Sequence, residues 1–179
     1  MKKLLFLSKM CLMALIMVAL PACTKEGNGN NTGTDGEVSG DYVDLGLSSG
    51  TKWKATNEKN PADAEYDFFT FDEAVATFGN KLPSRVQCEE LISSCEWTWQ
   101  GNGYKVVGPN GKFIILPASG YQSCEGNVDA VGMEGGVWSS ESIDDSYARS
   151  LGFAYFDGFS DINMGGARRC TGSSVRLVQ

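Results

Sequence analysis

Residues 82–116, LPSRVQCEELISSCEWTWQGNGYKVVGPNGKFIIL, combine a helix signal with the signals of a β-hairpin. Ser84 and Gln87 have the spacing of a capping box. Four apolar residues then follow at helical intervals: Cys88, Leu91, Ile92 and Cys95. Further on, Trp97-Thr98-Trp99 alternates, and Asn110-Gly111 separates two apolar runs, a strong sign of a hairpin. The stretch therefore predicts a helix that begins after Ser84 and is followed at once by antiparallel strands.

A second helix is expected just upstream, within residues 70–79. Thr70 and Glu73 again match the capping box, and Gly79 suits the residue that ends a helix. Its apolar face consists of Phe71, Ala74, Val75 and Phe78. The other signals are strands, expected at residues 42–47, 52–56, 97–99, 104–107, 113–116, 137–140, 147–156 and 174–178. Two short helices packed on short, mainly antiparallel strands define an α+β domain.

The charge balance argues against several classes of partner. The sequence has 15 basic and 22 acidic residues, and three of the basic residues lie within residues 1–22. The rest of the chain therefore has 15 − 3 = 12 basic and 22 acidic side chains, a net charge of −10. We expect neither nucleic acid nor an anionic lipid surface as a partner. The absence of histidine excludes Ser-His-Asp and Cys-His catalysis within the chain.

The first 23 residues have the layout of a secretory signal. Basic residues open the segment, an apolar run covers residues 4–20, and Leu20-Pro21-Ala22 comes directly before Cys23. This layout resembles a bacterial lipoprotein signal, in which residues 1–22 are removed and the Cys23 thiol is lipidated. The alternatives are an ordinary signal peptide and a transmembrane anchor, but a span needs about 20 apolar residues. We expect acyl chains on Cys23 to anchor the protein in the bacterial outer membrane.

Two further segments follow the signal. Residues 23–41 form a flexible tether rich in Gly, Asn and Thr, which cannot build a core. Within it, Lys25-Glu26 resembles the short charged signals of surface-exposed lipoproteins and equally fits an ordinary linker, so both membrane faces stay open. Residues 42–179 have the size of one domain and contain no second linker.

Four cysteines are left once Cys11 leaves with the signal and Cys23 carries lipid, and they allow three connectivities. Cys88 and Cys95 share one helix face about 10 Å apart, beyond the roughly 7 Å that a disulfide spans. We interpret these two as buried thiols. Cys124 and Cys170 lie in Gly-rich segments and are the favoured disulfide pair in an exported protein. Zinc binding is the competing interpretation, but the chain has no CxxC pair.

Six motifs occur in an order typical of exported bacterial proteins. They lie at residues 44–53 (DLGLSSGTKW), 82–84 (LPS), 116–121 (LPASGY), 138–141 (WSSE), 148–153 (ARSLGF) and 174–176 (SVR). Together they are similar to the FISUMP domain, the Fibrobacter succinogenes major paralogous domain, over nearly all of residues 42–179. The resemblance implies a C-type-lectin-like fold and a surface or secreted lipoprotein, and it implies no established activity. The segment at residues 59–69 is shorter than is usual in that family.

Carbohydrate binding is the main site hypothesis, because sugar rings stack on exposed aromatic faces. The candidate ligand-binding residues are Trp97, Trp99, Tyr104 and Tyr121. Trp97 and Trp99 point the same way in an alternating strand and would form one aromatic patch. The alternative is that this patch belongs to the core, where large aromatic residues contribute most.

We expect no metal, no cofactor and no catalytic residue. Four acidic residues lie in Gly- and Ser-rich sequence: Glu134, Glu141, Asp144 and Asp145. We interpret them as solvated rather than as a calcium site, because the calcium motifs of lectins are missing. Arg169-Cys170 faintly resembles the C-terminal cysteine region of formylglycine-generating enzymes, but no second cysteine lies nearby.

The sequence thus predicts a lipid-anchored envelope protein that binds rather than catalyses. Its expected partners are the membrane, through the anchor, and a glycan or a host or matrix polymer. A structural or assembly role in a surface protein complex is the alternative function, and an enzyme is the third.

Overall fold

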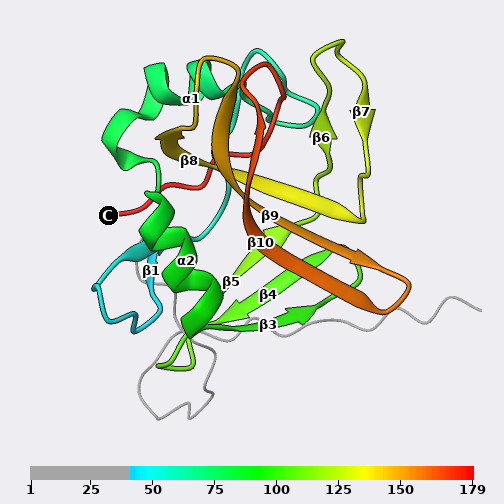
Figure 1. Ribbon diagram of the computed structural model, residues 1–179. Coiled ribbons are helices and arrows are strands. Elements are labelled where there is room, and N and C mark those ends of the chain that lie inside the picture. The colour runs from blue at the N-terminus through cyan, green and yellow to red at the C-terminus, as the bar shows by residue number, and fades with distance from the viewer. Residues whose placement is uncertain (1–40) are drawn as a thin grey trace, which may run out of the picture. The chain divides into compact units, whose positions relative to one another are not determined.

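The computed structural model of the chain describes residues 41–179, drawn in colour in Figure 1. The expected signal at residues 1–22, the lipidation site Cys23 and the expected tether up to residue 40 lie outside the described residues. Within residues 41–179, no helix combines the length and the apolar character needed to cross a bilayer.

The described part of the chain has two α-helices and a short 3-10 helix, with two strands before them and eight strands after them. The elements are β1 (Tyr42–Asp44), β2 (Lys52–Lys54), α1 (Phe71–Phe78), η1 (Gly79–Lys81), α2 (Arg85–Ser94), β3 (Glu96–Trp99), β4 (Gly103–Val107), β5 (Phe113–Pro117), β6 (Tyr121–Gln122), β7 (Val128–Asp129), β8 (Glu134–Ser142), β9 (Tyr147–Phe156) and β10 (Phe159–Arg168).

The strands form small antiparallel sheets. Two sheets have three strands each, in the orders β3-β4-β5 and β8-β9-β10, and two sheets have two strands each, β1-β2 and β6-β7. Figure 1 shows the long β9-β10 hairpin in orange beside the sheet β3-β4-β5 in green. The α+β class predicted from the sequence is confirmed.

Both helices begin at the capping boxes predicted from the sequence. The Thr70 side chain accepts a hydrogen bond from the Glu73 N–H, and the Glu73 carboxylate accepts from the Thr70 N–H. Ser84 and Gln87 form the same pair of bonds before α2. These bonds satisfy N–H groups that have no partner within the helix, so the boundary is decided locally.

One strand was missed, and one strand prediction was wrong. No strand was predicted at residues 159–168, where Asp161, Gly165 and Gly166 interrupt the apolar pattern, yet β10 pairs with β9 along its whole length. Residues 174–178 were expected to form a closing strand. They form isolated bridges instead, including Trp53–Val178 and a parallel one, Val137–Ser174. This buried segment fits between other elements and does not extend a sheet.

The core has two clusters. The first contains buried residues from β1, β2, α2 and both three-stranded sheets, among them Trp53, Leu91 and Leu151. The second joins α1 to the C-terminal segment around Trp138 and Val175. Strands β8 and β9 contribute buried residues to both clusters.

Candidate functional site

A groove of about 390 Å³ is lined by residues of the sheet β8-β9-β10, of β6 and of the segment after β10. This volume falls within the roughly 300–1,000 Å³ typical of small-molecule sites. Its lining consists of Gly120, Tyr121, Glu134, Gly135, Gly136, Tyr147, Ser150, Gly152, Gly166, Ala167, Arg168, Thr171 and Ser173. We call it the tyrosine groove, after Tyr121 and Tyr147, which are 38% and 44% exposed.

The floor of the tyrosine groove is made of very small residues. Gly136 pairs with Gly152 across β8 and β9, and Ser150 lies two residues away on the same face of the sheet. Gly152 has no positive φ, and a Cβ added to it would meet no atom within 4 Å. Neither the backbone conformation nor the packing therefore requires glycine at position 152. The absence of a side chain at this position leaves the floor of the groove open.

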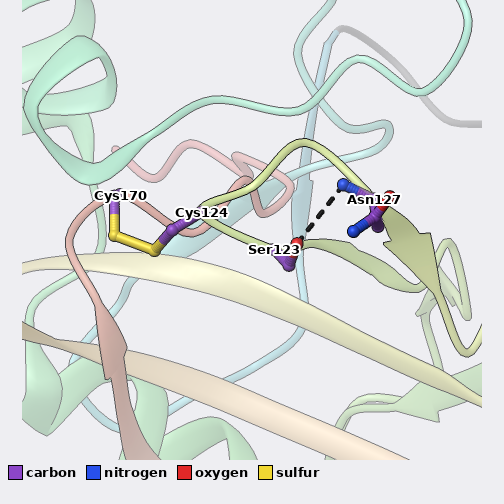
Figure 2. Close-up of a disulfide and its surroundings, with 4 residues drawn as sticks. All are labelled: Ser123, Cys124, Asn127 and Cys170. Carbon is purple, nitrogen blue, oxygen red and sulfur yellow. Dashed lines mark hydrogen bonds between the residues drawn. A yellow bond between two sulfur atoms is a disulfide. The ribbon is translucent and has the colours of Figure 1, made fainter.

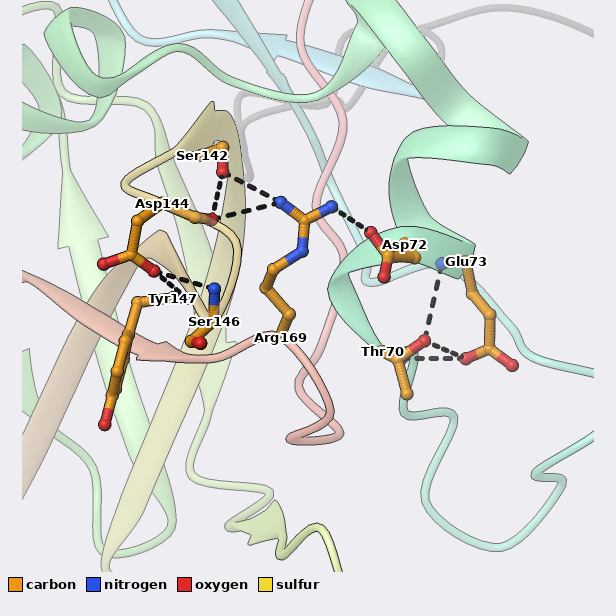
Figure 3. Close-up of polar contacts among 8 residues, drawn as sticks. All are labelled: Thr70, Asp72, Glu73, Ser142, Asp144, Ser146, Tyr147 and Arg169. Carbon is orange, nitrogen blue, oxygen red and sulfur yellow. Dashed lines mark hydrogen bonds and ion pairs between the residues drawn. The ribbon is translucent and has the colours of Figure 1, made fainter.

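Tyr147 is positioned by the turn that leads into β9. The Asp144 carboxylate accepts hydrogen bonds from the Ser146 N–H at 2.7 Å and the Tyr147 N–H at 2.8 Å. Figure 3 shows this turn beside Arg169. The bonds hold the first residue of β9, and with it the tyrosine ring, at one border of the groove.

Tyr121 is held by backbone pairing and by a disulfide. It pairs with Asp129 in the hairpin β6-β7, and its neighbour Gln122 exchanges two backbone hydrogen bonds with Gly172, each 2.9 Å. Cys124 and Cys170 form a disulfide, the pair favoured from the sequence, with Cα atoms 5.1 Å apart (Figure 2). The bond ties the hairpin that carries Tyr121 to the end of β10.

The charged residues of the groove lie far apart. Glu134 pairs with Ala154, whereas Arg168 pairs with Tyr147, seven residues away along β9. At about 3.3 Å per residue, their register positions are about 23 Å apart. Glu134 and Arg168 therefore line the groove at widely separated register positions, one acidic and one basic.

A second, more polar cavity of about 460 Å³ shares Arg168 with the tyrosine groove. Its other lining residues are Thr70, Asp72, Asp145, Ser146, Arg169 and Cys170. Figure 3 shows the Arg169 guanidinium between α1 and the β8-β9 turn. It donates to Asp72, to the Ser142 hydroxyl and to the Asp144 carbonyl. Arg169 therefore joins two elements that border this cavity.

The aromatic residues predicted to bind a ligand are divided by the structure. Tyr121 lines the groove, but Tyr104 is only 1% exposed, and its hydroxyl contacts the Ala154 carbonyl at 3.0 Å and Ser160 at 2.6 Å. Tyr104 is therefore a core residue, and its assignment as a ligand contact was wrong.

Trp97 and Trp99 point the same way, as expected, but toward the protein interior. Both are half-buried against the first core cluster. Trp99 stacks on Tyr155 with ring centroids 5.0 Å apart, and Trp97 lies edge to face with Tyr104 at 5.7 Å. We call Trp97, Trp99, Tyr104, Phe153 and Tyr155 the aromatic seam, because they join the two three-stranded sheets. This arrangement matches the core alternative for the tryptophan pair.

Within residues 41–179, the two cysteines outside the disulfide, Cys88 and Cys95, are poor nucleophiles. Burial, with a smaller contribution from nearby glutamates, raises the pKa of Cys88 to about 12 and that of Cys95 to about 11. Both thiols are therefore protonated at neutral pH. Cys170 is not a free thiol because it is bonded to Cys124.

Two of the four acidic residues considered for calcium, Glu141 and Asp144, accept hydrogen bonds from the backbone. Glu141 accepts the Arg85 N–H at 2.9 Å, and Asp144 caps its own turn. Within residues 41–179, no group of three or more acidic or cysteine side chains is arranged to hold a metal ion.

Arg176 of the SVR motif is buried and anchors the C-terminal segment. Its guanidinium donates to Asn57 Oδ1 and to the carbonyls of Lys54 and Ile115. Burial lowers its pKa to about 10, and Glu58 opposes this effect. Arg176 thus ties the C-terminal segment to β2 and β5.

Sequence reasoning missed Tyr147, Arg168 and Gly152 as site residues. Tyr147 and Gly152 were included only in a predicted strand, and Arg168 was not considered. An exposed tyrosine at the start of an alternating strand is the one local signal that could have drawn attention to this region. Comparisons with protein-family models, with curated proteins and with solved structures find no match to this chain.

Proposed function

We propose that this protein is a lipid-anchored binding module of the bacterial envelope, and that the tyrosine groove holds a short carbohydrate segment. One observation carries the proposal: two exposed tyrosines border a groove whose floor is glycine where a side chain would fit. An open floor between aromatic borders suits a flat, extended ligand.

The chemistry of the lining matches that of a sugar. The apolar C–H face of a sugar ring packs on an aromatic ring such as that of Tyr121 or Tyr147. Hydroxyl groups of the sugar find donors and acceptors in Ser150, Thr171 and Ser173, which all line the groove. A pocket with a few polar groups beside larger apolar surfaces is the usual form of a small-molecule site.

The fold family and the location belong to the same proposal. The six ordered motifs support a FISUMP domain with a C-type-lectin-like fold, and the segment ending at Cys23 supports a lipid anchor in the outer membrane. Replacing Cys23 with Ala should release the protein from the membrane fraction. Unchanged membrane retention of the variant would contradict the anchor.

Glycan binding is tested with the full chain in detergent micelles on an array of bacterial, plant and animal glycans. We expect a set of glycans to bind, and we expect Tyr121→Ala and Tyr147→Ala to weaken each by at least about tenfold. Phe159→Ala is the matched control, because Phe159 is an aromatic residue 79% exposed at the β9-β10 turn, outside the groove. Binding that persists in both tyrosine variants would contradict the proposal.

A second candidate function is an assembly role in a surface protein complex. Phe156 and Phe159 face each other across the turn between β9 and β10 and are 41% and 79% exposed. Paired exposed aromatics are common in protein interfaces. Crosslinking in intact cells tests this role: a crosslinked partner lost on Phe159→Ala, with no glycan signal on the array, would favour assembly over carbohydrate binding.

A further inference from the structure

Arg168 is a free positive charge at the point where the two cavities meet. It lines both, and its side chain is exposed. The ion pairs found within residues 41–179 are Lys54–Glu58, Lys59–Asp67, Arg85–Glu89 and Arg169–Asp72, and none involves Arg168. Its guanidinium also donates no hydrogen bond to another described residue.

The adjacent arginine serves a different purpose. Arg169 donates to Asp72, Ser142 and the Asp144 carbonyl, and its guanidinium lies 4.8 Å from the ring centroid of Phe71. These contacts fix Arg169 between α1 and the β8-β9 turn, so its side chain cannot turn toward a ligand without breaking them. The Arg168 side chain has no such contacts and can turn toward a ligand without breaking any.

We propose that the ligand of the tyrosine groove is an acidic carbohydrate whose carboxylate pairs with Arg168. This inference rests on the carbohydrate function proposed above and names the class of sugar. The planar guanidinium fork matches a carboxylate in two parallel hydrogen bonds, which are about twice as strong as bonds between neutral groups.

The negative charge of Glu134 sets the orientation of this ligand. The register position of Glu134 lies about 23 Å from that of Arg168 along β9, and the Glu134 carboxylate repels a carboxylate placed beside it. The groove therefore favours a segment with its acid at Arg168 and neutral sugars toward Glu134. A uniformly acidic polymer would place a negative charge beside Glu134.

The net charge of −10 after the signal does not prevent such binding. Exposed charges are screened over about 8 Å at physiological ionic strength. The electrostatic energy of a carboxylate in direct contact with Arg168 therefore comes mainly from that contact. Distant acidic residues lower the affinity for polyanions more than that for a single carboxylate.

The test compares trisaccharides that end in glucuronic, galacturonic or sialic acid with their carboxyl-reduced, neutral counterparts. Binding to the full chain in detergent micelles is measured by isothermal titration calorimetry. We expect at least one acidic probe to bind about tenfold more tightly than its neutral counterpart. Arg168→Gln should lower the affinity for the acidic probe to that of the neutral one, and Arg168→Lys should restore part of the difference.

Arg149→Gln is the matched control, because it removes the same charge from β9 at a residue that lines neither cavity. It should keep the preference for the acidic probe. Equal affinities for acidic and neutral probes, or a preference that survives Arg168→Gln, would overturn the inference while leaving the carbohydrate function standing. Failure of both kinds of probe to bind, or binding that Tyr121→Ala does not weaken, would overturn the carbohydrate function itself and this inference with it.

Discussion

The aromatic seam and the tyrosine groove use the same kinds of side chain for opposite purposes. In the seam, Trp97, Trp99 and Tyr104 pack against Phe153 and Tyr155 of β9. In the groove, Tyr121 and Tyr147 border glycines and small residues and keep a large part of their surface exposed. Strand β9 contributes to both, with Phe153 in the seam and Gly152 in the groove.

The comparison shows that an aromatic residue is not a ligand contact by its type alone. Whether an aromatic side chain is available to a ligand depends on the size of the residues that it faces. In an alternating strand, neighbouring residues lie on opposite faces, so Phe153 and Gly152 of β9 face opposite ways. Large neighbours bury an aromatic ring, and a glycine floor leaves it exposed.

Tyr104→Ala should have the largest effect, and it should fall on stability only. Truncating a buried aromatic residue costs about 3–5 kcal/mol in the free energy of unfolding, measured by urea denaturation. Tyr121→Ala should change that free energy by less than about 0.5 kcal/mol, because the residue is exposed. Comparable losses in the two variants would erase the distinction between seam and groove.

Removing the disulfide should come next and should affect the groove more than the seam. A Cys124→Ser and Cys170→Ser double variant opens a loop spanning 46 residues, which costs about 2–4 kcal/mol. Because the bond ties the Tyr121 hairpin to the end of β10, hydrogen exchange should rise in β6 and β7. Exchange that rises first in β3 and β4 would contradict this assignment.

Filling the groove floor should separate binding from folding. Gly152→Ala, Gly152→Val and Gly152→Leu add increasing volume where a Cβ meets no atom within 4 Å. Stability should stay constant or rise by up to about 1 kcal/mol, since glycine is a weak strand former. Glycan affinity should fall with side-chain size, by at least about tenfold for Leu. A uniform affinity across the series would show that the ligand does not use the floor.

The smallest effect is expected from lowering the pH, which should reduce the free energy of unfolding through Glu90. The Glu90 carboxylate of α2 accepts hydrogen bonds from the Ser48 hydroxyl at 2.7 Å and the Ser49 N–H at 2.9 Å. Burial opposes its ionisation, but the bonds from Ser49 and Ser48 outweigh this and lower its pKa below the ordinary value of 4.5. Its stabilising contribution is therefore present above pH 4.5 and lost as the pH falls through the folded-state value.

Glu90→Gln tests this by comparing free energies of unfolding from neutral pH down to pH 3. The difference from wild type should be largest at neutral pH and should shrink below about pH 4.5. A difference that stays constant with pH would show that the ionised carboxylate contributes nothing. Glycan affinity should not follow this titration, since Glu90 does not line the groove.

Local patterns predicted the elements well and the site poorly. The capping boxes at Thr70 and Ser84 use side chains three residues apart, so a short window of sequence contains all the atoms involved. The missed strand β10 depends on β9, which supplies its partners and overrides the weak strand preference of Gly165 and Gly166. The assignment of Tyr104 failed for a related reason, because Ala154 and Ser160, some fifty residues away, bury its hydroxyl.

The sequence by itself determined where the helices begin, that the domain is α+β and that catalysis cannot rely on histidine. It also singled out Cys124 and Cys170, the pair that the structure joins. These features depend on composition or on residues close together in the chain. Only the tertiary structure decided which aromatic residues are exposed and that Tyr121, Tyr147, Gly152 and Arg168 share one groove. They come from β6, β9 and β10, and exposure is set by which distant segment covers each face of a sheet.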